Sequence, residues 1–120
     1  MSEKDLREPV VLKVKDIEDL ARFVASVAAS GQPIYVLRFP HSGKHIYGML
    51  AVYHDYYDFY GMPLFYYYES DREIAGKYLV VKSEDAKESV SFSDGIKPGW
   101  IGVPVIALES APPFLRRLKV

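Results

Sequence analysis

The alternation of apolar and polar residues predicts a strand near the start of the chain and a helix after it. In residues 10–15, valine and leucine alternate with residues that include two lysines, which is the period of a strand with one buried face. From Asp16 the apolar residues recur at helical spacing as far as Ala28. Asp16 is suited to cap this helix and Gly31 to end it, because Pro33 cannot continue it.

From residue 34 onward the pattern is typical of strands and turns. Residues 40–44 form a turn cluster around Gly43. The last apolar segment holds Pro104, which belongs at a sheet edge or a bulge. Strands are predicted at 34–39, 46–54, 64–69, 77–82 and 103–108, with room for a short one at 89–92.

The order of these elements predicts an α+β fold. A single interior helix excludes repeated βαβ winding, in which each pair of parallel strands needs its own crossover helix. We therefore expect two layers: a mostly antiparallel sheet of five to six strands and one main helix packed on one face. A short C-terminal helix is predicted after Pro112 and Pro113. Residues 1–8 are expected to form a flexible arm before a single domain of residues 9–120.

The strand at 46–54 divides its side chains between two different faces. The aliphatic face is expected to meet the helix, and the tyrosine face to look away from it. No helix is assigned to that second sheet face, so something must account for the aromatic residues on it. The first face carries Ile46, Gly48, Leu50 and Val52, and the second carries Tyr47, Met49, Ala51 and Tyr53.

Residues 53–68 hold seven of the ten tyrosines. A tyrosine joins a large apolar ring to a hydroxyl that needs a partner, so it suits a partly buried surface. These rings form either a platform on which bases stack or a core or subunit contact. The sequence leaves both alternatives open, and residues 66–68 must split between the two faces of their strand.

Composition narrows the classes of function. The chain has no cysteine, which excludes disulfides and thiolate chemistry, and its net charge of −1 argues against a histone-like binder. Asparagine and threonine are absent and glutamine occurs once, a bias seen in hyperthermophile proteins. Neither a signal pattern nor an apolar run of membrane-spanning length occurs, so we expect a cytoplasmic protein without a membrane partner.

Other candidate chemistry is weaker. His41 and His45 are separated by a glycine-containing turn, which does not place both imidazoles on one face. A metal site could be drawn only by adding His54, Asp55 and Asp58 from the following segment, and we predict none. The chain contains neither a complete phosphate-binding loop nor a nucleophile elbow, so we expect no catalytic residue and no cofactor.

Aromatic rings interleaved with lysine and arginine predict non-enzymatic binding of single-stranded DNA or RNA. Every base offers a ring face and every phosphate a charge. Trp100, in a predicted loop with Lys97, is either a stacking anchor or a cover for the core. The alternative is a structural protein whose aromatic face forms a homo-oligomer. The predicted nucleic-acid-binding residues are Lys13, Lys15, Arg38, Lys44, Tyr47, Tyr53, Tyr66, Tyr68, Lys82 and Trp100.

The single early helix, the sheet after it, the dense tyrosines and the composition resemble the ThermoDBP-related proteins of hyperthermophilic archaea. The resemblance covers architecture and composition over roughly residues 9–108 and includes no signature motif. It implies binding of single-stranded nucleic acid in an aromatic and basic cleft, and an archaeal, thermophilic source. The chain lacks the long C-terminal zipper of some members, so the oligomeric state is left open, and no individual residue is carried over.

Overall fold

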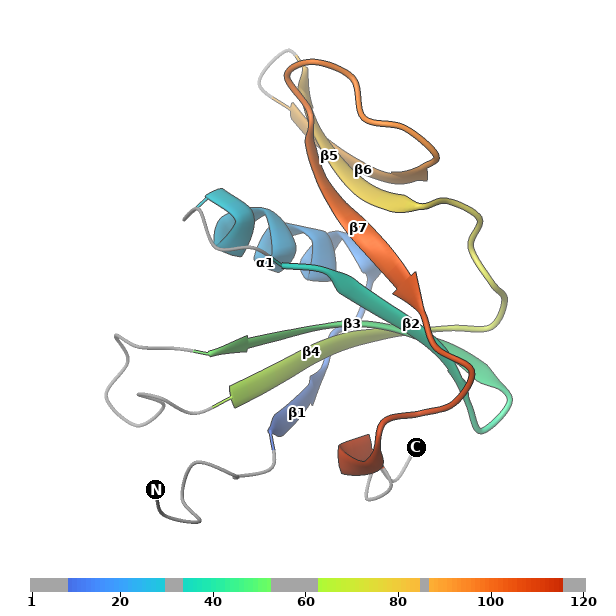
Figure 1. The fold of residues 1–120 in the computed structure, drawn as a ribbon. Coiled ribbons are helices and arrows are strands. Elements are labelled where there is room, and N and C mark those ends of the chain that lie inside the picture. The colour runs from blue at the N-terminus through green and yellow to red at the C-terminus, as the bar shows by residue number, and fades with distance from the viewer. Residues whose placement is uncertain (1–8, 30–33, 53–62, 85–86, 116–120) are drawn as a thin grey trace.

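The computed structural model describes residues 9–29, 34–52, 63–84 and 87–115. It is an α+β fold with one α-helix and a seven-stranded mixed sheet (Figure 1). The elements are, in chain order, β1 (Val10–Lys13), α1 (Ile17–Ala29), β2 (Val36–His41), β3 (Lys44–Val52), β4 (Pro63–Ser70), β5 (Tyr78–Glu84), β6 (Lys87–Ser93), β7 (Ile101–Ala107) and the 3-10 turn η2 (Pro113–Leu115).

The sheet corrects the prediction of five to six mostly antiparallel strands. Its order is β1-β4-β3-β2-β7-β5-β6, in which β1 runs parallel to β4 and β2 parallel to β7. The other four neighbouring pairs are antiparallel. The prediction was wrong because alternation within a strand reports its faces but carries no information on which strand lies beside it, or in which direction.

The predicted C-terminal helix is also wrong within the described residues. Only η2 forms there, a single turn in which the Leu115 N–H donates to the Pro112 carbonyl oxygen over 3.0 Å. Pro112 and Pro113 have no N–H to donate, so the first backbone hydrogen bond of this segment begins only beyond them.

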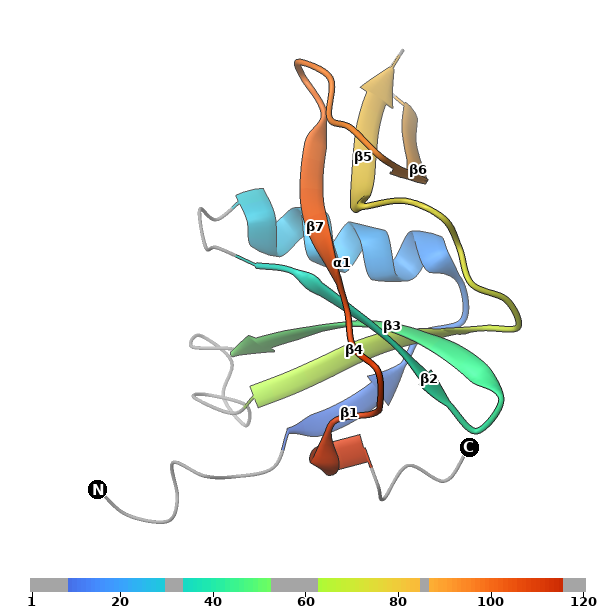
Figure 2. The ribbon, with the colours of Figure 1, turned by 45° about the vertical axis from the view of Figure 1, so that its right-hand side comes forward.

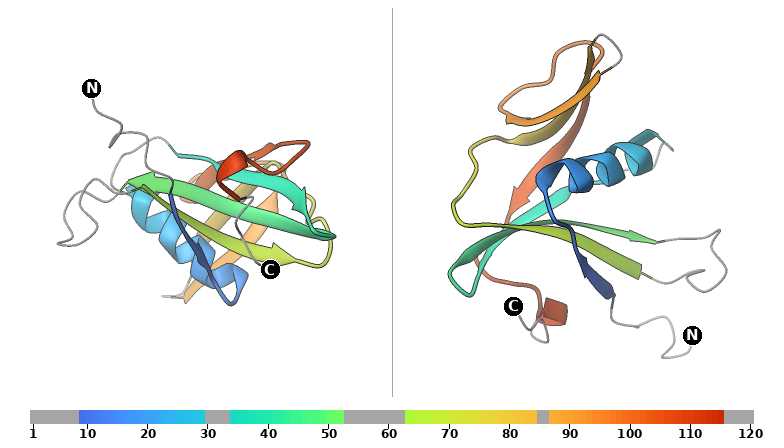
Figure 3. Two further views of the ribbon diagram at one scale, coloured as in Figure 1. Left: turned by 90° about the horizontal axis from the view of Figure 1, so that it is seen from below. Right: turned by 180° about the vertical axis from the view of Figure 1, so that it is seen from behind.

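The sheet bends around α1, which lies on its concave side (Figures 1 and 2). We call β1, β4, β3 and β2 the first half of the sheet, and β7, β5 and β6 the second half. The side that carries α1 is the helix face, and the opposite side is the outer face. Views from below and behind show η2 on the outer side of the first half, away from α1 (Figure 3).

Helix α1 begins where the sequence predicts. An oxygen of the Asp16 carboxylate accepts a hydrogen bond from the Asp19 N–H over 3.0 Å, which is the expected N-terminal cap. Leu20, Ala21 and Val24 are fully buried on one side of the helix, against the sheet. The helical period and the cap are therefore both confirmed.

On β3, the helix face carries the set that contains Tyr47, which is the reverse of the prediction. Tyr47 and Met49 are fully buried in the cluster that contains the α1 residues. Ile46 instead belongs to a second cluster on the outer face, and Leu50 shares its side of the strand. The alternation correctly divided the β3 side chains into two sets. It could not show which set faces the helix, because both sets are apolar.

Two contacts with residues distant in the chain explain this orientation. The Ile74 N–H donates to the Tyr47 hydroxyl oxygen over 2.7 Å, and that hydroxyl lies 3.2 Å from the Ile74 carbonyl oxygen, so the buried phenol has partners. On the outer face, the Phe65 ring lies against Gly48 so closely that a Cβ there would be 2.2 Å from its Cζ. Only glycine leaves room for that ring.

The second cluster covers much of the outer face of the first half. Phe39, Phe65 and Tyr67 are buried there, with the Phe65 and Tyr67 ring centroids 6.1 Å apart. Leu115 from η2 is fully buried in the same cluster. The face predicted to be open therefore holds a small core, capped by the end of the described chain.

Burial raises the pKa of the Tyr67 hydroxyl above its ordinary value, with Lys13 opposing this shift and Glu69 adding to it. Because the folded state binds this proton more tightly than the unfolded state, its contribution to stability is complete below about pH 10 and is lost as the pH rises through the folded-state pKa. We expect Tyr67→Phe to lose less stability than the wild type between pH 9 and pH 11 in urea titrations. Equal losses would contradict the assignment.

Pro104 lies in β7, where that strand exchanges one partner for another. Residues 101–104 pair with β5, whereas residues 105–107 pair with β2. A proline cannot donate to a ladder, and at this point β7 has a described pairing on only one side. Because no second strand is paired with Pro104 at this point, the proline is accommodated within a central strand.

No helix in the described part of the chain has the length and apolarity needed to cross a lipid bilayer.

Candidate nucleic-acid interface

The tyrosines predicted to stack bases are largely withdrawn from the surface. Tyr47 has no exposed area, and Tyr66 packs its ring against Phe23 with the centroids 4.0 Å apart. Tyr68 is half-buried against the same helix-face cluster. Tyr53 lies outside the described residues. A base cannot reach the Tyr47 ring without opening the core.

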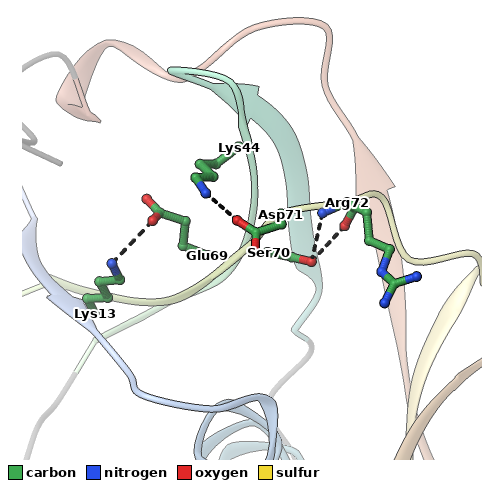
Figure 4. A network of polar contacts seen from close by, with 6 residues as sticks. All are labelled: Lys13, Lys44, Glu69, Ser70, Asp71 and Arg72. Carbon is green, nitrogen blue, oxygen red and sulfur yellow. Dashed lines mark hydrogen bonds and ion pairs between the residues drawn. The ribbon is translucent and has the colours of Figure 1, made fainter.

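Three of the predicted phosphate contacts are held by carboxylates. The Lys13 ammonium lies 3.2 Å from Glu69, and the Arg38 guanidinium lies 3.3 Å from Glu73. Lys44 pairs with Asp71 (Figure 4). A phosphate at any of these sites must compete with a carboxylate already in place.

The ion pair between Lys44 and Asp71 shifts the pKa of both groups toward their charged forms. A hydrogen bond to the Asp71 carboxylate, aided by its charge, raises the pKa of Lys44 above its usual value. The same contact lowers the pKa of Asp71. Both groups are therefore charged at neutral pH and satisfy each other.

The turn after β4 holds Asp71 opposite Lys44 (Figure 4). The Ser70 hydroxyl donates to the Arg72 carbonyl oxygen over 2.6 Å and accepts from the Arg72 N–H over 3.3 Å. One oxygen of Glu69 and Nε2 of His41 are buried without a hydrogen-bond partner among the residues that the structure describes. This corner is thus an ion-pair network built around the end of β4.

Lys82 and Trp100, predicted from separate segments, are brought together. The Lys82 Nζ lies 4.4 Å from the centroid of the Trp100 ring, and the Lys97 Nζ lies 5.4 Å from it. Both distances are within the range of a cation–π interaction. We call Lys82, Lys97 and Trp100 the Trp100 site.

The Trp100 site lies on the outer face of the second half of the sheet. Leu79 and Val81 face the helix, so Lys82, one residue further along β5, points to the outer side. Trp100 immediately precedes β7, where Val103 faces the helix, and so shares the outer side. The alternation of side chains along β5 and β7 therefore places the Trp100 ring and the Lys82 ammonium on the same side of the sheet.

Among the side chains that the structure describes, which leave out those of residues 83–88, neither lysine of the Trp100 site has a carboxylate partner. They differ in this from Lys13, Arg38 and Lys44. With respect to the described side chains, an anion can approach the two ammonium groups without displacing a carboxylate. Lys15, also predicted as a contact, is exposed in a bend after β1 and lies outside the sheet.

The connection between β6 and β7 fixes the position of Lys97. The Trp100 N–H donates to the Lys97 carbonyl oxygen over 3.1 Å, which closes a turn with Gly99 at a φ of 84°. The Ser93 hydroxyl donates to the Gly95 carbonyl oxygen over 2.8 Å at the start of the same connection. Both ends of the connection are therefore held by hydrogen bonds.

The middle of this connection packs on the sheet through Ile96. A Cβ on Gly102 would lie 2.3 Å from the Ile96 Cδ1, so the isoleucine occupies the space that a side chain would fill. Gly102 pairs with Val80, which faces the outer side and is nevertheless fully buried. The connection therefore covers the outer face at this point.

Sequence reasoning placed Lys97 near Trp100 but did not include it among the binding residues. The Pro98-Gly99 turn signal between them was the available clue, because a tight turn brings its ends together. Ser89 of β6 was missed as well. It is exposed and lies opposite Lys82 in the ladder, a neighbour that no single-strand pattern reveals.

The metal site considered for the histidines is not seen within residues 9–29, 34–52, 63–84 and 87–115. No three potential ligands among them lie close enough to share an ion. His41 lies two positions after the outer-face residue Phe39, and so shares its face. His45 lies two positions before the helix-face residue Tyr47, so the two imidazoles belong to opposite faces. His54, Asp55 and Asp58 fall outside the described part.

No family model, curated protein or solved structure matches this chain. The resemblance to the ThermoDBP-related proteins stays a prediction.

Proposed function

We propose that this chain binds single-stranded nucleic acid at the Trp100 site. In this proposal one base stacks on the Trp100 ring, and phosphates contact Lys82 and Lys97. The observation that supports it is the pair of ammonium groups over the only tryptophan, neither of them paired with a carboxylate among the side chains that the structure describes. Aromatic rings beside basic groups serve single-strand binding in general.

The magnitudes favour weak but measurable binding. Stacking of one base on an aromatic side chain contributes roughly 1–3 kcal/mol, and each phosphate contact adds a salt-dependent term. An incoming base displaces cation–π contacts that are worth about 0.5–1 kcal/mol each at exposed sites. The released ammonium groups are then free to meet the phosphates, which offsets that loss.

Because Trp100 is the only tryptophan, its fluorescence reports directly on the site. We expect a dodecamer of thymidine to quench this fluorescence saturably, and to bind more weakly at 200 mM salt than at 50 mM. A uridine dodecamer in parallel distinguishes RNA from DNA. Absence of quenching at 50 mM salt, together with no change in the anisotropy of a labelled oligonucleotide, would overturn the proposal.

Trp100→Ala is expected to weaken binding of the labelled dodecamer by about 5- to 150-fold, the equivalent of the loss of one stacked base. Anisotropy is the measurement, since the variant has no tryptophan. Tyr35→Ala is the control, because Tyr35 is 47% exposed beside β2 in the other half of the sheet. Equal losses in both variants would place binding elsewhere.

A second candidate function is assembly of copies through the outer face of the first half. Leu50 on this face and Ile106 on the same side of the adjoining β7 are each 41% exposed, beyond the buried cluster. Interfaces between protein copies bury apolar side chains that are exposed in the single chain. Size-exclusion chromatography with light scattering tests it: a dimer is expected, with Leu50→Lys shifting it to monomer, and a wild-type monomer would retire this candidate.

A further inference from the structure

We infer that the Trp100 site recognises one stacked base with the phosphates on either side of it, so that it engages only a short stretch of a single strand, whatever the length of that strand. This inference rests on the proposed function and adds the size of the unit that is bound. A long strand running across the sheet is the alternative that it excludes.

The first observation is a barrier on the outer face. Ile96 packs on Gly102 beside the buried Val80, and so lies across the sheet next to the site. Tyr78 is the next aromatic residue on the outer face of β5, two positions before Val80. The Ile96 contact therefore separates the Trp100 ring from the Tyr78 ring, and a strand stacked on one cannot pass flat to the other.

The second observation concerns charge. On the outer face of the first half, the cations Lys13 and Lys44 are both held by carboxylates. The chain as a whole carries a formal net charge of −1, so no general positive field extends the site. A strand therefore gains little from phosphates placed over the outer face of the first half.

These two observations predict the salt dependence. For single strands, the logarithm of the binding constant falls with the logarithm of the salt concentration with a slope of about −0.7 for each phosphate neutralised. Two contacts give a slope of about −1.4. A track of six phosphates would give a slope of about −4, so the two cases are well separated.

The experiment combines strand length with salt. Thymidine oligonucleotides of four and twelve residues, each with a 5′-phosphate, are titrated against the wild type by tryptophan fluorescence from 50 to 200 mM salt. We expect the affinity for four and twelve residues to agree once the number of available positions on each strand is allowed for. The slope should be close to −1.4 for both.

Two variants and a control assign the contacts. Lys82→Gln and Lys97→Gln should each reduce the magnitude of the slope by about 0.7. Lys15→Gln should leave it unchanged, because this exposed lysine lies outside the site. Affinity that keeps rising with length, a slope near −4, or an effect of Lys15→Gln would overturn the short footprint while leaving the proposed function standing. Failure of every oligonucleotide to quench Trp100 would overturn the proposed function itself.

Discussion

Tyr47→Ala is expected to lower the free energy of unfolding by about 3–5 kcal/mol, the range for removal of a buried aromatic side chain. The ring is fully buried between the sheet and α1, and its centroid lies 5.1 Å from that of Phe92 in an edge-on contact. Removal leaves a cavity and strips the Ile74 backbone of its side-chain partner. Urea unfolding followed by circular dichroism gives the value.

Two further variants separate the parts of this effect. Tyr47→Phe keeps the ring and removes the hydroxyl, so it should cost about 1–3 kcal/mol, since the Ile74 N–H loses its acceptor in a part-buried place. Tyr35→Ala, at an exposed tyrosine, should change stability by less than about 0.5 kcal/mol. If Tyr47→Ala behaved like Tyr35→Ala, the assignment of Tyr47 to the core would be wrong.

Gly48→Ala is expected to destabilise the fold by about 1–3 kcal/mol or more, the usual cost of an extra carbon in a filled core. The new Cβ would overlap the ring of Phe65, which is itself fully buried and cannot swing into solvent. Gly95→Ala is the matched control, because a Cβ added at Gly95 would meet no atom within 4 Å beyond its chain neighbours. Urea midpoints of the two variants, compared at equal slope, give the difference.

The cause of that loss can be tested by a second substitution. Phe65→Leu shortens the side chain that the new Cβ would strike, so the Gly48→Ala/Phe65→Leu double variant should be more stable than the sum of the single effects predicts. Simple additivity would show that the cost of Gly48→Ala arises elsewhere, for example in the backbone of β3.

The sequence predicts the type and order of the elements along the chain, because each helix or strand depends on the periodicity of its own residues. Helix α1 and its Asp16 cap are set by residues within a few positions of one another. The strands likewise lie close to their predicted ranges. The turn between β2 and β3 is shorter than predicted, because Pro40 and His41 pair with β3 and only two residues make the bend.

The orientation of the strands depends on contacts that local periodicity does not contain. Both faces of β3 are apolar, and the choice between them depends on Ile74 and Phe65, which lie in distant parts of the chain. The parallel pairing of β2 with β7 likewise joins residues 36–38 to residues 105–107. No pattern within either segment specifies the other.

The candidate site was predictable only in fragments. Residue type alone singled out Trp100 as an aromatic anchor and Lys82 as a cation. Their meeting depends on the β5–β7 pairing, and the selection of Lys82 over Lys13 or Lys44 depends on which cations the fold supplies with carboxylates. Charge pairing between distant strands thus decides which predicted contacts remain available.

Because β7 lies late in the chain and in the middle of the sheet, the sheet can be completed only late in synthesis. This strand alone connects the two halves of the sheet, since it lies between β2 and β5. Leu37 pairs with Gly48 on one side and gains its second neighbour only when Ile106 is in place, and closing so long a loop is entropically slow. While the chain emerges from the ribosome, the edge of β2 stays unpaired and open to aggregation, the usual hazard of an exposed strand edge. We expect nascent chains that end before residue 101 to be the ones that need a chaperone.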